Sequence, residues 1–228
     1  MNVQKRRNAQ FSDPVGAAVD HIDRLIADGQ LLPGQRLVEA DLSEQLKIGR
    51  GPIREALRIL AGDGVVELMP NRGARVRSFT GREMAEMIKA LVGLLCIGVE
   101  EFVGGPAYAS GMQRLRAVLA GYPALIRAGD GFGLLDAMAR YQQTVFEAAG
   151  NAYLVELHRR VHFHHYNRQM LTTLGLDHLR RTAEVYGRVT RALEARNAVL
   201  ASALLKTAVA EIVEVVGALD ELPIAQRA

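Results

Sequence analysis

Three arginines, Arg50, Arg54 and Arg58, recur at intervals of four residues in the first third of the chain. The stretch from Lys47 to Arg77 holds seven basic and three acidic residues, in a chain whose net charge is only +3. A guanidinium group can donate two parallel hydrogen bonds to a phosphate or to O6 and N7 of guanine. Arginines at this spacing therefore point to nucleic-acid binding, provided that the fold presents them on one surface.

The segments around these arginines predict a helix-turn-helix. Apolar periodicity and terminating glycines predict helices over residues 13–29, 39–46 and 51–62. In the third helix the apolar positions share one face, Arg54 and Arg58 fall on the opposite face, and Arg50 lies just before the first turn. A short helix followed by a second one with outward arginines is typical of a unit that reads the major groove.

A β-hairpin is expected directly after the third helix. Residues 65–69 and 74–77 read as two strands around the turn Pro70-Asn71-Arg72-Gly73. In the second strand Val76 should face the core, with Arg75 and Arg77 outward. The pattern predicts a winged helix-turn-helix, with Arg72 at the tip of the wing, where it would reach the DNA backbone or the minor groove.

At this point the residues resemble a known family. The segments Gly29-Gln30-Leu31-Leu32-Pro33-Gly34-Gln35-Arg36-Leu37, Arg50-Gly51-Pro52-Ile53-Arg54-Glu55-Ala56-Leu57 and Asn71-Arg72-Gly73-Ala74-Arg75-Val76 are similar to the winged helix of GntR-family transcription regulators. The resemblance implies that Arg36, Arg50, Arg54 and Gly73 contact the operator. Where the family usually has serine and threonine beside the arginine, this chain has Gly49 and Gly51, so two hydroxyl groups are missing.

A second domain is expected from residue 79 to residue 228, after a DNA-binding domain over 1–78. It reads as about six or seven consecutive helices with no competing strand pattern. Breaks are expected at 104–106, 121–123, 129–131, 150–151, 175 and near 197. The fold class is therefore mainly α: a winged helix-turn-helix with a small β-hairpin wing, followed by an all-α antiparallel bundle that can hold a ligand in its core.

Within the bundle, residues 141–151 resemble the signature of the FCD effector domain of the FadR subfamily. That domain usually holds a divalent metal with one aspartate and three histidines. The matching positions here are Met138, Gln142, Tyr186 and Ala208, and this set is a poor one for a metal. We expect no metal cofactor, and a pocket in which Gln142 and Tyr186 bind an effector by hydrogen bonds instead.

The other candidates for effector binding are a lysine and a group of histidines. Lys89 lies near a position where the family has an arginine, so it would suit an organic-acid effector, or it is a solvated lysine. On one helix His158, His162 and His165 would share a face. They are then a polar helix face, an effector-binding or pH-sensitive group, or a relocated metal site.

Composition limits the other functions. No apolar run is long enough to span a membrane, the basic start has no signal core, and Cys96 is the single cysteine, so we expect a cytoplasmic protein. No nucleophile–base pair or paired carboxylates stand at a spacing that suggests an enzyme. The sequence predicts a homodimeric regulator, on the family pattern a repressor, that binds an operator under effector control. The alternative is a DNA-binding dimer whose bundle is only a dimerisation scaffold.

Overall fold

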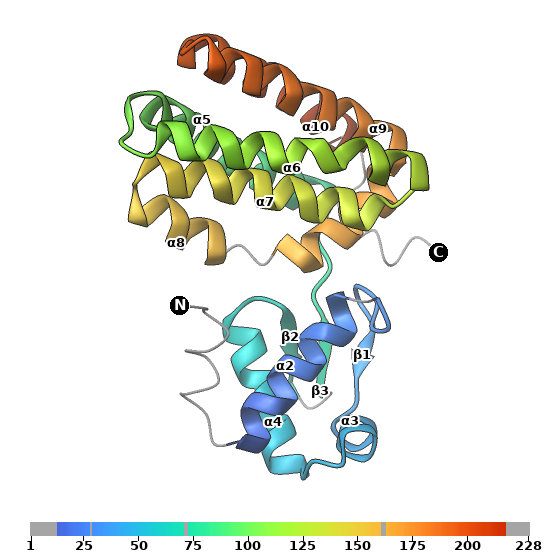
Figure 1. Ribbon diagram of the computed structural model, residues 1–228. Helices are drawn as coiled ribbons and strands as arrows, with labels where there is room; N and C mark the ends of the chain where they lie inside the picture. Colours follow the sequence, from blue (N-terminus) through green and yellow to red (C-terminus); the bar gives the residue numbers. More distant parts are fainter. Residues whose placement is uncertain (1–12, 28, 71–72, 161–162, 218–228) are drawn as a thin grey trace. The chain divides into compact units, whose positions relative to one another are not determined.

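The computed structural model describes residues 13–27, 29–70, 73–160 and 163–217. The chain divides into two compact units between Ser78 and Phe79 (Figure 1). The first unit combines helices with a small sheet, and the second is built from helices. None of the described helices has both the length and the apolar composition that crossing a bilayer requires.

Three helices form the body of the first unit, in agreement with the sequence prediction. They are α2 (Asp13–Ala27), α3 (Glu39–Leu46) and α4 (Arg50–Gly62). Their apolar stripes meet in one core, in which Ile22, Ile53 and Leu60 are completely buried. Burying one such side chain contributes about 1.5–3 kcal/mol, so this core is what holds α4 against α2.

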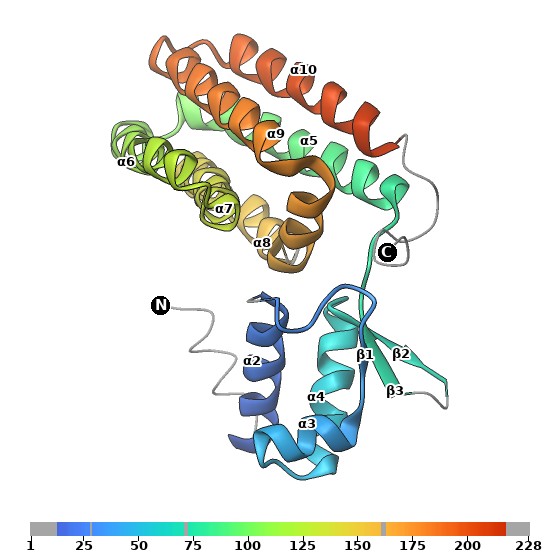
Figure 2. The same ribbon diagram turned by 90° about the vertical axis from the view of Figure 1, so that its right-hand side faces the viewer.

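The wing is a three-stranded antiparallel sheet in the order β1-β3-β2 (Figure 2). Strands β2 (Val66–Met69) and β3 (Gly73–Val76) form the expected hairpin, with Val76 buried. Strand β1 (Arg36–Leu37) was not expected, because two residues are too few to show an alternating pattern. Its pairing with β3 places Arg36 opposite Arg75 and buries Leu37 in the core.

The second unit is an all-helical bundle, as the sequence predicts. Its helices are α5 (Gly81–Gly104), α6 (Tyr108–Ala128), α7 (Gly131–Ala149), α8 (Ala152–Arg160), α9 (Phe163–Glu194) and α10 (Ala198–Gly217). Helix α10 packs along α5 and α9, and α7 packs along α5 and α6 (Figures 1 and 2). Helix α5 begins with a capping box in which the Thr80 hydroxyl accepts from the Glu83 N–H and the Glu83 carboxylate accepts from the Thr80 N–H.

The expected breaks at 121–123 and at 175 have different outcomes. The predicted break at 121–123 is wrong, because α6 continues through Pro123. Pro123 is exposed, whereas the neighbouring Tyr122 is buried and holds this turn of the helix against the bundle. At an exposed position the carbonyl that proline leaves without a partner can be hydrated. The break at 175 is confirmed, because Gly175 has non-helical φ 70° and ψ 170° and divides α9 into two helical segments that meet at a kink.

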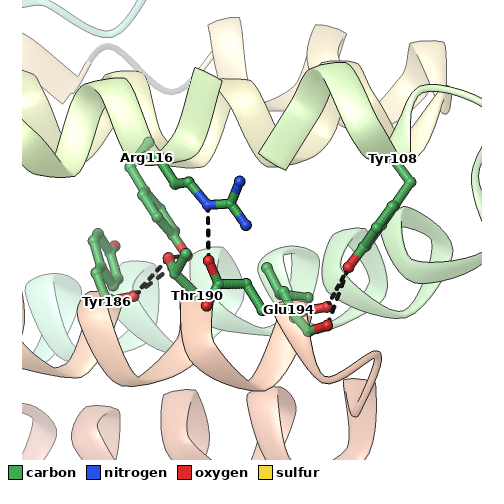
Figure 3. Close-up of polar contacts among 7 residues, drawn as sticks. Tyr108, Arg116, Tyr186, Thr190 and Glu194 are labelled. Atoms are coloured by element: carbon green, nitrogen blue, oxygen red, sulfur yellow. Dashed lines mark hydrogen bonds and ion pairs between the residues drawn. The ribbon is translucent and has the colours of Figure 1, made fainter. Parts of the chain in front are cut away.

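Polar contacts fix α6 against the end of α9 (Figure 3). The Tyr108 hydroxyl donates to the carbonyl oxygen of Leu193 at 2.9 Å, and Arg116 Nε donates to Glu194 Oε1 at 2.8 Å. The guanidinium of Arg196 lies 4.0 Å from the centre of the Tyr108 ring. These contacts hold the far half of α9 in place, which matters because that half forms one wall of the cavity described below.

Candidate DNA-binding surface and bundle cavity

Helix α4 presents its amino terminus and its arginines to solvent. Its N-cap is Gly49, which offers no capping side chain, and Arg50 is the first helical residue. The expected start at Gly51 was therefore one residue late, and Arg50 belongs to the helix. Without a capping side chain, the first N–H groups of α4 stay open to an external acceptor such as a phosphate, an arrangement that helix termini use for anions.

Arg54 is held by a carboxylate of the neighbouring helix. Its Nε lies 3.1 Å from Glu39 Oε1 and its Nη2 lies 2.8 Å from Glu39 Oε2, so the pair is bidentate between α4 and α3. The hydrogen bond from Arg54, aided by the charges of Arg54, Arg50 and Arg58, lowers the pKa of Glu39 below its usual value. Arg54 nevertheless keeps 57% of its side chain exposed.

The remaining basic residues of the first unit differ in how they are held. Arg58 makes an exposed ion pair with Glu55 at 3.3 Å, whereas half-buried Arg75 pairs across the hairpin with Glu67 at 2.6 Å. Arg36 is exposed on β1. The prediction for Arg72 falls on a residue that lies outside the described ranges.

Gly73 occupies a position that requires glycine. Its φ is +82°, and a Cβ there would lie 3.2 Å from the carbonyl oxygen of Leu37. A side chain would be strained by the backbone and would press on β1. Gly73 therefore lets β3 start next to β1, and this sets where the wing stands relative to α4. A groove of about 540 Å³ separates the two and is lined by Arg54, Arg58, Leu68 and Gly73, among others.

The bundle contains a cavity of about 100 Å³ between α5, α7, α9 and α10, and this cavity is partly open to solvent. The four positions that match the family's metal ligands, Met138, Gln142, Tyr186 and Ala208, all line its wall. They come from three helices and lie up to seventy residues apart in the sequence. The four positions that the family resemblance matched to metal ligands therefore lie together at one cavity in the fold.

Gln142 and Tyr186 are joined by a short hydrogen bond inside this unit. Gln142 Nε2 donates to the Tyr186 hydroxyl at 2.6 Å, and Gln142 Oε1 lies 3.3 Å from Nε2 of buried His158. Tyr186 also stacks on Tyr141 with ring centres 4.5 Å apart. Burial raises the pKa of Tyr186 to about 12 and lowers the pKa of His158 to about 4, since each charged form would lose its hydration. Both groups are uncharged at neutral pH.

The chemistry of these four side chains does not fit a divalent metal. They offer a thioether, an amide, a phenol that keeps its proton and a methyl group, whereas zinc and its neighbours take imidazole, thiolate or carboxylate. The amide and phenol are also already hydrogen-bonded to each other. Within the described residues no group of three His, Cys, Asp or Glu side chains is placed to hold a metal ion.

Two candidate effector groups do not lie where the sequence placed them. Lys89 is exposed and is not part of the cavity wall, because it shares the outer face of α5 with Arg82, Glu86 and Gly93. His158 lies on α8 and His165 lies on α9, on either side of residues 161 and 162, which lie outside the described ranges. His158 is buried against Phe146 rather than part of a polar surface. His162 and the side chain of His165 lie outside what the structure describes.

The kink at Gly175 shapes the cavity, and its removal should destabilise the bundle. Met170 and Leu174 before the kink and Leu179 and Tyr186 after it all line the cavity. We expect Gly175→Ala to lower the free energy of unfolding by about 1–2 kcal/mol, because its φ and ψ suit glycine almost alone. Urea unfolding followed by circular dichroism measures this change.

Gly187→Ala is the matched control in the same helix. Gly187 has an ordinary backbone conformation and open space around its Cβ position. This substitution should therefore raise the free energy of unfolding by about 0.5–1 kcal/mol. A loss of stability equal to that of Gly175→Ala would mean that the kink has no special role.

Comparisons with known proteins agree with this arrangement. Residues 14–76 match the family described as bacterial regulatory proteins, gntR family, and residues 105–211 match the FCD domain. The chain is 31% identical over 81 residues to an uncharacterized HTH-type transcriptional regulator, YdhC, of Bacillus subtilis, an alignment that spans 36% of each chain. It is 27% identical over 136 residues to a Paenarthrobacter nicotinovorans protein named "Probable D-xylose utilization operon transcriptional repressor", covering 60% of this chain and 59% of that protein.

Solved structures share the fold over most of the chain. A transcriptional regulator GntR from Rhodococcus sp. RHA1 superposes with a TM-score of 0.76 at 24% identity, covering 91% of this chain and 99% of that one. McbR/YncC of E. coli superposes with a TM-score of 0.71 at 18% identity, covering 91% and 98%. The matched domains are those of transcription regulators, not of enzymes. With a GntR winged helix followed by an FCD domain, the chain belongs to the GntR family of bacterial regulatory proteins.

Proposed function

We propose that this protein is a homodimeric transcription regulator whose two winged helices bind a pseudo-palindromic operator. The observation that carries the proposal is the exposed side of α4, where Arg50, Arg54 and Arg58 stand beside an uncapped helix terminus. Arg50 and Arg54 then read bases in the major groove, and Arg36 and Arg72 fix the position of the domain on the backbone or minor groove. The wing and its Gly73 complete the contact surface. Repression, as in the name of the xylose-operon relative, is the mode of action proposed.

Selection of bound fragments from the source genome tests this function directly. The expected result is enrichment of sites with two inverted half-sites separated by one or two helical turns, as a symmetric dimer requires. Affinity for the selected sites should exceed affinity for random DNA by about three orders of magnitude or more at physiological salt. Equal binding to selected and random fragments would contradict the proposal.

The Glu39–Arg54 pair predicts a separable effect on specificity. We expect Glu39→Gln to strengthen binding to random DNA by roughly threefold, because a negative charge leaves the arginine surface. The ratio of specific to random affinity should fall, since Arg54 loses the carboxylate that orients it. Fluorescence anisotropy with both DNAs measures the two constants.

Glu44→Gln is the control for Glu39→Gln. It removes the same charge from an exposed position of the same helix α3. It should therefore change random binding less and leave the specificity ratio unaltered. Indistinguishable behaviour of the two variants would contradict an orienting role for Glu39.

We further propose that the cavity holds a small-molecule effector that changes operator affinity. Its support is a pocket between four helices with three polar residues on an otherwise apolar wall, as ligand sites have. Effector control requires that the ligand binds the DNA-competent and incompetent arrangements with different affinity. In the alternative, the bundle is only a dimerisation scaffold, and no ligand of any class would alter the operator affinity.

The donor chemistry of the cavity also predicts the metal content. Protein purified without chelator should retain less than stoichiometric zinc, nickel and manganese, because Met138, Gln142, Tyr186 and Ala208 cannot replace one carboxylate and three imidazoles. Elemental analysis of the dialysed protein measures this content. One equivalent of metal, removed by Gln142→Ala but retained by Gln143→Ala on the outer face of α7, would overturn the prediction.

A further inference from the structure

The wall of the bundle cavity is almost entirely apolar. Of the seventeen residues that line it, the polar ones are Gln142, Thr182 and Tyr186. None of the seventeen carries a charge. A carboxylate bound there would lose part of its hydration and meet no cation among the residues described, which disfavours its charged form. Lys89, the cation that an acidic ligand would need, is exposed on the outside of α5.

Among the described residues, the hydrogen bonds of these three polar side chains leave two donors, the second Nε2 proton of Gln142 and the hydroxyl proton of Tyr186. Thr182 donates to the carbonyl oxygen of His178 at 3.1 Å, within its own helix. Gln142 donates to the Tyr186 hydroxyl and faces His158 with its oxygen. The Tyr186 hydroxyl accepts from Gln142, and among the described residues no acceptor stands opposite its own proton. A bound molecule with an oxygen acceptor would satisfy that proton.

The size of the cavity limits the ligand. Its volume of about 100 Å³ is somewhat below the roughly 150 Å³ at which an apolar protein cavity holds benzene. A bound ring therefore requires the flexible Met138 and Met170 side chains on the wall to move and enlarge the cavity. The space therefore suits a compact body of the size of one substituted ring, not a cofactor or a sugar.

We propose that the cavity binds an uncharged, mostly apolar molecule of about one ring's size, whose single carbonyl or ether oxygen accepts a hydrogen bond from Tyr186. This inference rests on the proposed effector function and names its ligand class. It differs from recognition of a carboxylate through a metal ion, because here an apolar wall supplies affinity and a phenol supplies orientation. Tyr186 is held for this task by its stacking on Tyr141 and its hydrogen bond from Gln142.

Binding of three probes of equal size to the full-length protein tests the proposed ligand class. Acetophenone, benzoate and cumene have the same number of non-hydrogen atoms but offer a neutral carbonyl, a charged carboxylate and no oxygen. Calorimetric titration should rank acetophenone first and cumene second, with benzoate at least tenfold weaker than acetophenone at pH 7.5. EDTA should leave the ranking unchanged. Benzoate binding as tightly as acetophenone, or failure of acetophenone to bind at millimolar concentration, overturns the proposal.

Two variants assign the binding to this cavity. Tyr186→Phe keeps the ring that stacks on Tyr141, so acetophenone should bind roughly five- to tenfold more weakly while cumene is unaffected. Ala208→Phe fills the cavity from α10, so both probes should be lost while circular dichroism still reports a folded bundle. Acetophenone binding unchanged in both variants would place the site elsewhere and overturn the inference.

A parallel measurement of operator affinity keeps the two proposals apart. If acetophenone binds with the expected ranking but leaves operator affinity unchanged, the ligand class stands and effector control by this ligand fails. If operator affinity responds to benzoate but not to acetophenone, effector control stands and the ligand class is overturned.

Discussion

Arg50→Ala should weaken binding to the operator by about 1–3 kcal/mol, roughly a five- to 150-fold loss, concentrated at one base position. Arg50 is the first residue of α4, is exposed and has no ion-pair partner among the described residues, so its guanidinium is available to a base edge. Arg58→Ala should cost less than about 1 kcal/mol and change no base preference, because Arg58 stands two turns further along and is paired with Glu55.

Binding to a set of operators with each base substituted in turn measures this prediction. In the Arg50 variant one position should lose its preference while the others keep theirs, and binding to random DNA should change little. The slope of log affinity against log salt should fall by about one in a variant that loses only a phosphate contact. An Arg50 variant that loses affinity equally for specific and random DNA would show that Arg50 contacts phosphate.

The structure also explains why Arg54 should behave differently from Arg50. Its bidentate contact with Glu39 joins the two helices of the helix-turn-helix, so Arg54→Ala would remove the proposed base contact and a link between α3 and α4 together. Its effect on affinity then includes a stability component, which Arg50→Ala lacks. The sequence could not show this link, because residues 39 and 54 become neighbours only when α3 folds against α4.

Much of the first unit could be predicted from the sequence because its helices are amphipathic and its hairpin alternates. Helix α3 was predicted with its observed bounds, and α4 to within one residue. The short strand β1 could not be predicted, because it exists only through its hydrogen bonds to β3. The continuation of α6 through Pro123 depends on the burial of Tyr122 against α7, a tertiary contact that overrides the local preference.

The residues in and around the cavity could likewise be predicted only in part, because some of them depend on tertiary contacts. The wall positions Gln142 and Tyr186 followed from the family resemblance, which carries the three-dimensional arrangement with it. Of the two alternatives for Lys89, the solvated lysine agrees with the structure, and its i−3 and i+4 neighbours, Glu86 and Gly93, share the exposed face of α5. The burial of His158 depends on α7, because Phe146 of that helix covers the imidazole ring. Within residues 152–160 the one sign of this burial is apolar Leu154, which lies one turn earlier on the same face and is also buried.

Buried His158 makes the stability of the bundle depend on pH in a defined window. Its pKa is about 4 in the folded protein, lowered by burial from the ordinary 6.5. Between these values the unfolded chain binds a proton that the folded chain does not, so stability falls as the pH falls from 6.5 to about 4. The full shift corresponds to about 3 kcal/mol. The pKa of His178 is lowered by burial too and acts in the same direction.

His158→Gln should remove most of this dependence. The amide cannot take up a proton but can still hydrogen-bond to Gln142, so the variant should lose little stability at pH 7 and should become more stable than wild type near pH 4.5. Phe146→Leu is the control, because it loosens the packing around His158 and lowers stability at both pH values. The free energies of unfolding from urea titrations at pH 4.5 and 7 decide the matter. Equal loss of stability by wild type and His158→Gln on acidification would contradict this prediction. It would mean that His158 takes up its proton in the folded protein without a free-energy cost, and that its hydrogen bond to Gln142 does not require a neutral imidazole.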